Sequence, residues 1–188
     1  IGMEAYVAAR KHTDKEPGKD KARYHLIILA MNNKGYENLM KLSTIANLDG
    51  LYYKPRIDHD LLEKYNEGLI ILSGCASGEI GESLKNGSYE EAKKTAEWYK
   101  SIFGDRYYLE MQDHGDWQDQ LKINEGVNKL SSELKIPKVL TGDAHYLNKD
   151  DAQAHEILLC VGTAAYLSDK NRMSLDGFHL HVRDPKEI

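Results

Sequence analysis

The sequence predicts an α/β fold built on a largely parallel sheet. Short apolar runs alternate along the chain with longer segments of helical periodicity, which is the pattern of strands connected by helices. The runs are nearly continuous, as expected for strands covered on both faces, and they are Tyr24–Met31, Gly68–Ser73 and Val139–Thr141. Candidate reactive side chains directly follow two of these strands, a position that carries the active site in open doubly wound sheets and in closed barrels alike.

The composition indicates a globular protein of about one domain. The chain has 188 residues, of which 41% are hydrophobic and 29% are charged. It has no apolar run near the ~20 residues of a membrane span and no signal-peptide pattern, so we expect a cytoplasmic protein without a membrane partner. Two cysteines do not make a disulfide scaffold. The net charge of −5 gives no overall positive field that would attract nucleic acid. A local basic surface is still compatible with this charge.

The first residues alternate like a strand that places Glu4 and Tyr6 on one face and the apolar positions 3, 5 and 7 on the other. A glutamate inside an apolar strand is costly to bury unless it is paired or bound to a cation, and the alternative is a half-exposed strand with Glu4 in water. Because the chain starts inside a strand and without an initiator methionine, we expect it to be a piece of a longer protein.

Helices are predicted between the strands. The first begins at Asn33 as its N-cap and ends near Leu48. Its predicted inward face carries Tyr36, Leu39, Met40, Ser43 and Ala46, with Leu42 and Ile45 at the edge. A short helix starts at Asp58 or Asp60. The remaining predicted elements are helices at Gly78–Asn86, Tyr89–Ile102, Asp119–Leu134 and Lys149–Val161, a strand at Tyr107–Met111 and an extended closing segment at Asp176–Arg183.

The segment Ile136–Tyr146 carries the first candidate site. Residues two positions apart in an extended chain point to the same side, so we expect Asp143 and His145 to aim at one point just past a strand end. Carboxylate and imidazole groups are common ligands of zinc, manganese and iron. The alternative is that Asp143 caps the following helix and that His145 is solvated.

Further candidates carry weaker signals. Cys75 follows a predicted strand in a turn of small residues, where a thiolate can face a metal or a substrate, although small buried cysteines are common. Cys160 lies among aliphatic residues and is predicted to belong to the core. His25 stands at the start of its strand, and strand periodicity gives no account of it. His114 and Arg56 are candidates for lining a substrate cleft, and an ordered loop is the alternative for Arg56.

A set of short blocks in a fixed order covers essentially the whole chain. This ordered set closely resembles the PHP (polymerase and histidinol phosphatase) domain at the N-terminus of bacterial replicative DNA polymerase III alpha subunits. The blocks are Glu4–Val7, Arg23–Ile27, Tyr36–Ser43, Tyr53–Arg56, Leu72–Cys75, Gln112–Gly115 and Gly142–Tyr146.

The resemblance implies a distorted (β/α)7 barrel with a multinuclear metal site. Carried over block by block, it implies that the metal ligands are Glu4, His25, Cys75, Asp143 and His145. Zinc, manganese or iron would be the cofactor. The implied partners are DNA, through a parent polymerase, and replicase subunits such as a sliding clamp or a proofreading subunit.

Three functions are compatible with this resemblance. The first is a metal-dependent phosphoesterase that acts as a 3′–5′ proofreading exonuclease in the parent DNA polymerase. The second is a structural platform that stabilises the polymerase and binds its partners. The third, more distant, is a small-molecule phosphatase, against which the blocks Tyr36–Ser43 and Tyr53–Arg56 argue because they match the polymerase branch.

The chain departs from the family pattern at its beginning. The family's His-x-His pair, an aspartate and a further histidine would all precede Ile1, together with the first strands of the barrel. We therefore expect residues 1–188 to form a single PHP domain lacking its N-terminal part, with an apolar flank prone to association and with little or no nuclease activity of its own. His179-Leu180-His181 imitates the missing pair at the wrong end of the chain.

Overall fold

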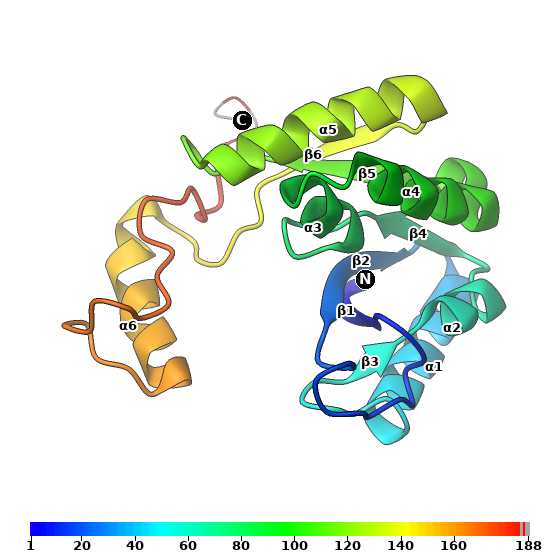
Figure 1. Cartoon of the computed structure of the whole chain (residues 1–188), viewed down its shortest axis with the longest axis horizontal. Coiled ribbons are helices and arrows are strands. Elements are labelled where there is room, and N and C mark those ends of the chain that lie inside the picture. The colour runs from blue at the N-terminus through cyan, green and yellow to red at the C-terminus, as the bar shows by residue number, and fades with distance from the viewer. Residues whose placement is uncertain (185, 187–188) are drawn as a thin grey trace. The chain divides into compact units, whose positions relative to one another are not determined.

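The computed structural model describes residues 1–184 and 186, and it divides into two compact units (Figure 1). The first unit comprises Ile1–Met111 and Lys122–Val139. The second comprises Gln112–Leu121 and the segment from Leu140 onward. The family resemblance predicts that residues 1–188 belong to a single PHP domain, and this assignment stays a prediction.

The described residues form one sheet with the strand order β3-β1-β2-β4-β5-β6, which confirms an α/β fold. The order is that of an open sheet with β3 and β6 at its edges, so the described strands do not by themselves make the predicted barrel. The strands are β1 Gly2–Ala8, β2 Arg23–Ala30, β3 Arg56–Ile57, β4 Leu69–Leu72, β5 Tyr107–Gln112 and β6 Lys138–Thr141.

The prediction of a largely parallel sheet is wrong. Strand β2 is antiparallel to both β1 and β4, whereas β1 with β3 and β4 with β5 are parallel. The reason lies in the connection from Ala8 to Arg23, which contains no helix and returns the chain directly alongside β1. Two antiparallel neighbouring strands can be joined without a helical crossover, whereas two parallel ones need it. The apolar pattern of a strand is the same for both directions, so it does not predict which of them occurs.

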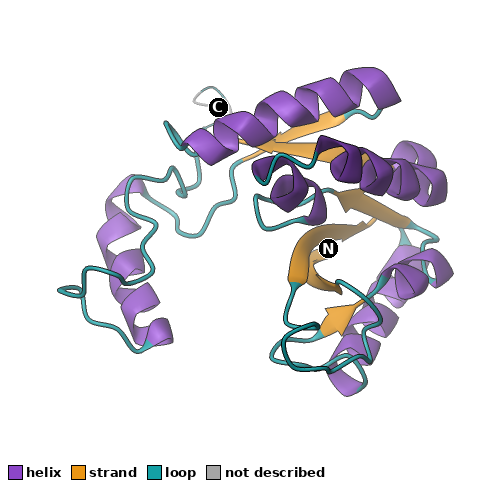
Figure 2. Cartoon of the chain, in the orientation of Figure 1, coloured by secondary structure: helices purple, strands orange, loops and turns teal. Residues whose placement is uncertain are grey.

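Apart from the direct connection of β1 to β2, helices separate the strands as predicted, and the helix ends lie within three residues of the predicted ones (Figure 2). Helix α1 packs on β2, β3 and β4, while α4 packs on β4 and on α3. The helices are α1 Asn33–Leu48, α2 His59–Lys64, α3 Glu79–Lys85, α4 Tyr89–Phe103, α5 Gln118–Leu134 and α6 Ala152–Thr163, with short 3-10 turns at Gly104–Arg106 and Lys149–Asp151. None of the helices in the described part of the chain is long and apolar enough to cross a membrane.

Helix α1 buries a face that is rotated from the predicted one: Leu39 and Ala46 are buried as predicted, whereas Tyr36 and Met40 are not. Its N-cap is Asn32, whose side chain accepts a hydrogen bond from the backbone N–H of Gly35, rather than Asn33. Tyr36 and Met40 are 43% and 48% exposed. A Cβ at Gly35 would lie 1.9 Å from the carbonyl oxygen of Gly68, so the helix approaches the loop before β4 on its glycine side. The buried residues are therefore Gly35, Asn38, Leu39, Leu42 and Ala46.

The core of the first unit follows the predicted periodicities elsewhere. Ala5 and Val7 of β1 are buried, so Glu4 and Tyr6 lie on the opposite face of that strand. Helix α4 buries the stripe formed by Ala92, Ala96 and Tyr99, as predicted. In the second unit Cys160 is buried, which confirms its place in a core. The closing segment Asp176–Arg183 forms no strand and makes one isolated bridge, between His181 and Tyr146.

Candidate metal centre

Strands β1 and β2 bring Glu4 and His25 together. Tyr6 lies opposite His25 in the antiparallel register, and Glu4 is two residues from Tyr6, so the three side chains share one face of the sheet. A carboxylate oxygen of Glu4 lies 2.7 Å from Nδ1 of His25. The edge of the His25 ring also meets the ring of Tyr6, at a centroid distance of 5.1 Å. The position of His25, which strand periodicity left unexplained, follows from this pairing.

The turn after β4 adds Cys75 to the same place. Gly74 has a positive φ of 80°, and a Cβ there would lie 2.6 Å from the carbonyl oxygen of His25, so a glycine is required for the turn to approach β2. The backbone N–H of His25 donates to the carbonyl oxygen of Ser77 at 3.0 Å, which ties the turn to the strand. Sγ of Cys75 thereby lies 3.5 Å from Nδ1 of His25.

The charge state of His25 follows from these two neighbours. Hydrogen bonding to Cys75 and then to Glu4 raises the pKa of His25 to about 10, against an opposing contribution from its partial burial. At neutral pH the imidazole therefore carries a proton on the nitrogen that faces the carboxylate and the thiol. A metal ion binding at this point has to displace that proton, so the binding is coupled to pH.

The donor set fits a transition metal. Glu4, His25 and Cys75 each offer one potential ligand atom, and these three atoms all lie within 4.8 Å of one another. Among the described residues, these side chains therefore form a group that could hold a metal ion. Ligand atoms around one zinc ion at bond lengths of about 2.0–2.3 Å lie about 3–4 Å apart, so small side-chain rotations would close the set. Oxygen, nitrogen and sulfur donors together suit zinc or iron.

Asp143 and His145 form a separate pair in the second unit. The prediction of an extended chain here is wrong, because Asp143 has a left-handed backbone with φ of 45°. The two side chains still approach each other, with Oδ1 of Asp143 4.0 Å from Nδ1 of His145. Nδ1 of His145 also contacts the carbonyl oxygen of Asp143 at 2.6 Å, which leaves Nε2 available to a metal. Their role as ligands stays a prediction.

His114 is enclosed rather than exposed at a cleft surface. Its side chain is 6% exposed, and its Nε2 lies 3.0 Å from Oε1 of Gln112 and 3.9 Å from Oδ2 of Asp143. Burial is the main cause that lowers the pKa of His114, so its imidazole is neutral at pH 7. Nδ1 is buried without a hydrogen-bond partner in the described residues. The ring packs against Trp117 and Phe178, which also contact each other.

Arg56 has a structural position instead of a place in a cleft. Its side chain is 1% exposed, and its guanidinium lies 5.1 Å from the ring centroid of Tyr52. All of its hydrogen bonds go to backbone carbonyl oxygens, which belong to His12, Asp14, Asp20 and Gly50. Because these carbonyls lie in the loop between β1 and β2 and at the end of α1, Arg56 holds the loop that allows β2 to pair with β1.

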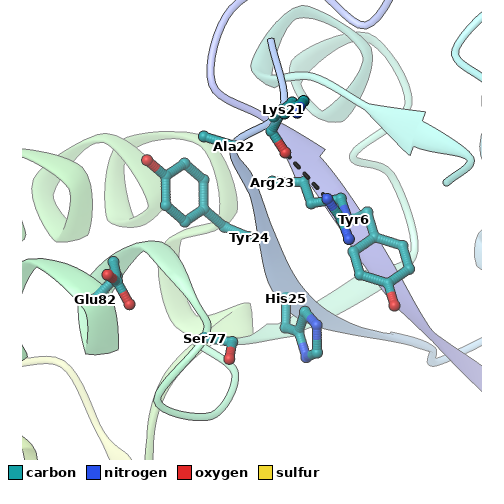
Figure 3. A pocket seen from close by; sticks show the side chains of 8 residues that line it. All are labelled: Tyr6, Lys21, Ala22, Arg23, Tyr24, His25, Ser77 and Glu82. Carbon is teal, nitrogen blue, oxygen red and sulfur yellow. Dashed lines mark hydrogen bonds between the residues drawn. The ribbon is translucent and has the colours of Figure 1, made fainter. Parts of the chain in front are cut away.

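A pocket beside the three-residue cluster was not predicted (Figure 3). It has a volume of about 430 Å³ and opens at the start of β2. Figure 3 shows Tyr6, Arg23 and His25 on one side of this strand and Tyr24 with Glu82 on the other. The predicted strand began at Tyr24, one residue too late to include Arg23, so strand periodicity did not pair Arg23 with His25. The block Arg23–Ile27, which contains both residues, is the sequence signal for this arrangement. The lining residues are Tyr6, Lys21, Ala22, Arg23, Tyr24, His25, Ser77 and Glu82.

Comparison with known proteins agrees with this geometry. The sequence model of the PHP domain matches residues 1–114, which include Glu4, His25 and Cys75. The chain is 44% identical to the DNA polymerase III subunit alpha of Borreliella burgdorferi over 189 residues, 44% identical to that of Treponema pallidum over 184 residues, and 38% identical to that of Thermus aquaticus over 190 residues. These alignments cover 96–100% of this chain but only 16% of each relative's length.

The match to the PHP model covers more than half of the chain and the whole of the three-residue cluster. The order of the sequence blocks, the α/β sheet that carries them and this match agree, and the chain belongs to the PHP domain family.

Proposed function

We propose that the chain is the metal-binding phosphoesterase part of a bacterial DNA polymerase III alpha subunit, which removes a terminal nucleotide from a DNA 3′ end. The observation that carries this proposal is the convergence of Glu4, His25 and Cys75 from two strands and a turn onto one point. Membership in the PHP family and similarity to subunits named DNA polymerase III alpha support the choice of parent protein and of substrate.

In this proposal the three side chains hold a metal ion, which when bound supplies Lewis acidity toward a water molecule and neutralises charge on a phosphodiester. The carboxylate of Glu4 and the thiolate of Cys75 provide the negative charge that stabilises the cation. His25 gives up the proton on Nδ1 and becomes a neutral ligand. The strand pairing and the Gly74 turn bring together the backbones that carry the three donors before binding, so only side-chain rotations are needed to close the set.

The complete domain is proposed to be a distorted (β/α)7 barrel in which Asp143 and His145 are further ligands. His145 presents Nε2 because its Nδ1 faces a carbonyl oxygen, and Asp143 offers a half-exposed carboxylate. We propose that the parent works in the cytoplasm on DNA, together with replicase subunits such as a sliding clamp or a proofreading subunit. The incomplete ligand set leads us to propose little or no nuclease activity for this chain by itself.

The metal proposal is tested on the chain itself by competitive zinc titration against a chromogenic chelator. Cys75→Ser is expected to lower the affinity at least tenfold, because it replaces a thiolate by a hydroxyl that stays protonated. Cys160→Ala is the control, because it removes the other free thiol, which does not belong to the Glu4–His25–Cys75 cluster. Equal zinc affinity in the two variants would contradict the assignment of the cluster.

The exonuclease proposal is tested on the full-length subunit with a 3′-labelled single strand. Cys75→Ser and His25→Asn are expected to abolish chelator-sensitive release of the terminal nucleotide and to leave DNA synthesis intact. Robust chelator-sensitive turnover by the isolated chain would overturn the proposal that it is inactive.

A second candidate is a non-catalytic platform for the rest of the polymerase. The observation in its favour is the exposed apolar surface of the second unit, where Leu158, Val161 and Tyr166 are 66%, 75% and 75% exposed. The chain spans only 16% of the relatives' length, so the remainder of the polymerase is the proposed occupant. The two functions separate in the full-length subunit: a platform predicts that cluster variants lower the melting temperature and that the wild type releases no nucleotide.

A further inference from the structure

The side chains beside the metal cluster include two cations that no carboxylate neutralises. Lys21 and Arg23 line the pocket at the start of β2, together with His25 of the cluster. Among the described residues neither Lys21 nor Arg23 forms an ion pair, although the chain has 30 acidic residues against 25 basic ones. Lys21 instead lies over the ring of Tyr53, with its ammonium 5.7 Å from the centroid.

The hydrogen-bonding capacity of Arg23 is mostly unused. Its Nη1 donates to the carbonyl oxygen of Lys21 at 3.1 Å, and its Nε is shielded from water with no partner in the described residues. The guanidinium of Arg10, by comparison, makes two hydrogen bonds to Asp20. A shielded donor without a partner costs free energy, and a planar guanidinium with free N–H groups is suited to a phosphate.

Arg23 is close enough to the cluster for one ligand to reach both. Arg23 and His25 are two positions apart on β2, which places their side chains on one face with their Cα atoms about 6.6 Å apart. The ring of Tyr6 lies between them, with the Arg23 guanidinium carbon 5.6 Å from its centroid and the His25 ring at 5.1 Å. Figure 3 shows these three side chains together at the pocket.

The acidic residue of the pocket does not oppose an anion strongly. Glu82 lies on the other side of β2, next to Tyr24 (Figure 3), and its carboxylate pairs with Lys85 at 2.5 Å and accepts a hydrogen bond from Asn86. The carboxylate of Glu4, on the same face as Arg23, is paired with His25. The two unpaired cations therefore dominate the local charge on the Tyr6 side of the pocket.

We propose that Arg23 and Lys21 form a phosphate subsite that holds the backbone of a nucleic-acid single strand next to its end at the Glu4–His25–Cys75 cluster. This inference rests on the proposed phosphoesterase function, because it names the side chains that hold its substrate. Arg23 contacts the phosphodiester directly, Lys21 adds charge at the rim, and Tyr6 fixes the guanidinium. The subsite is a binding site and takes no part in bond cleavage.

The test measures the binding of a fluorescein-labelled oligothymidylate to the chain by anisotropy, in chelator and at several salt concentrations. Arg23→Gln is expected to weaken binding roughly tenfold and to reduce the slope of log K against log salt by about 0.7, the value for one lost contact to a single strand. Lys21→Gln is expected to have a smaller effect of the same sign. Lys94→Gln is the control, because Lys94 is 71% exposed on α4 and pairs with Glu91.

Equal affinity of wild type and Arg23→Gln, or an equal loss in Lys94→Gln, would overturn the proposal. Competition by inorganic phosphate as strong as by unlabelled oligothymidylate would also overturn it, since a strand-binding site prefers the diester. Folding of each variant is checked by its melting temperature, and zinc affinity is measured in parallel. An Arg23-dependent loss of strand binding in a chain that binds no zinc would keep the subsite and remove the phosphoesterase proposal, so the two failures are distinguishable.

Discussion

Asp143 holds His145 through its own backbone: Nδ1 of His145 lies 2.6 Å from the carbonyl oxygen of Asp143, whose φ is 45°. A left-handed backbone at a residue other than glycine is tolerated best by asparagine and aspartate, because their short polar side chains bond locally. The residue type at position 143 therefore serves two purposes, since it permits the turn and supplies a carboxylate.

Substitution at Asp143 separates these purposes. Asp143→Ala is expected to lower the free energy of unfolding by about 1 kcal/mol through backbone strain. Asp143→Asn is expected to keep stability within about 0.5 kcal/mol of wild type. Both variants remove the charge and are expected to weaken metal binding, the alanine variant more strongly because it keeps no oxygen donor. Urea denaturation and zinc titration measure the two effects, and an alanine variant as stable as the asparagine variant would show that the turn carries no strain.

Metal binding is expected to protect one of the two thiols from alkylation. Cys75 is partly exposed and Cys160 is buried, so the metal-free chain should show one fast and one slow reaction with iodoacetamide. Zinc is expected to slow the fast reaction about tenfold or more and to leave the slow one unchanged, because only Cys75 belongs to the cluster. Peptide mapping identifies each site, and protection confined to Cys160 would contradict the assignment.

The same protection should depend on pH. Because the pKa of His25 is raised to about 10, its imidazole is protonated below that pH and competes with the metal. The zinc concentration needed for half protection is therefore expected to fall as pH rises from 6 to 9. A concentration that stays constant over this range would show that His25 is not a ligand.

Arg56 is expected to be a large contributor to stability. Arg56→Met keeps most of the side-chain volume but leaves four carbonyl oxygens without their charged donor, which should lower the free energy of unfolding by on the order of 3 kcal/mol. Lys54→Met, at a neighbouring exposed position, is the control and should change it by less than about 0.5 kcal/mol. Urea unfolding curves for the two variants provide the measurement, and similar midpoints would rule out a structural role for Arg56.

Asp20 should make an acid-sensitive contribution to the same loop. Its carboxylate accepts two hydrogen bonds from Arg10, and this contact lowers the pKa of Asp20 to about 2. A lowered folded-state pKa gives stability that is complete above the unfolded value of about 3.9 and is lost as pH falls toward 2. The urea midpoints of wild type and Asp20→Asn are therefore expected to differ at pH 7 and to converge between pH 4 and 2. A constant difference down to pH 2 would contradict the assignment.

The local sequence pattern predicted the buried face of a helix correctly where helical periodicity alone determines that face. The stripe of Ala92, Ala96 and Tyr99 on α4 is one example, because helical periodicity places these residues on one face and a single apolar face has one way to be buried. Helix α1 is the counterexample. Its inward face is set by the contact between Gly35 and Gly68, which lie far apart in the sequence, and so the predicted face was shifted.

The sequence by itself determined the α/β class, the order of elements, the family resemblance and the residue types able to bind a metal. Tertiary structure decided which of those residues meet. His25 joins Glu4 because β2 is antiparallel to β1, and Cys75 joins them because Gly74 lets a turn approach β2. The loop held by Arg56 and the unpaired Arg23 beside the cluster are likewise products of folding. Strand direction and register depend on contacts between distant residues, and a local pattern of apolar residues does not encode them.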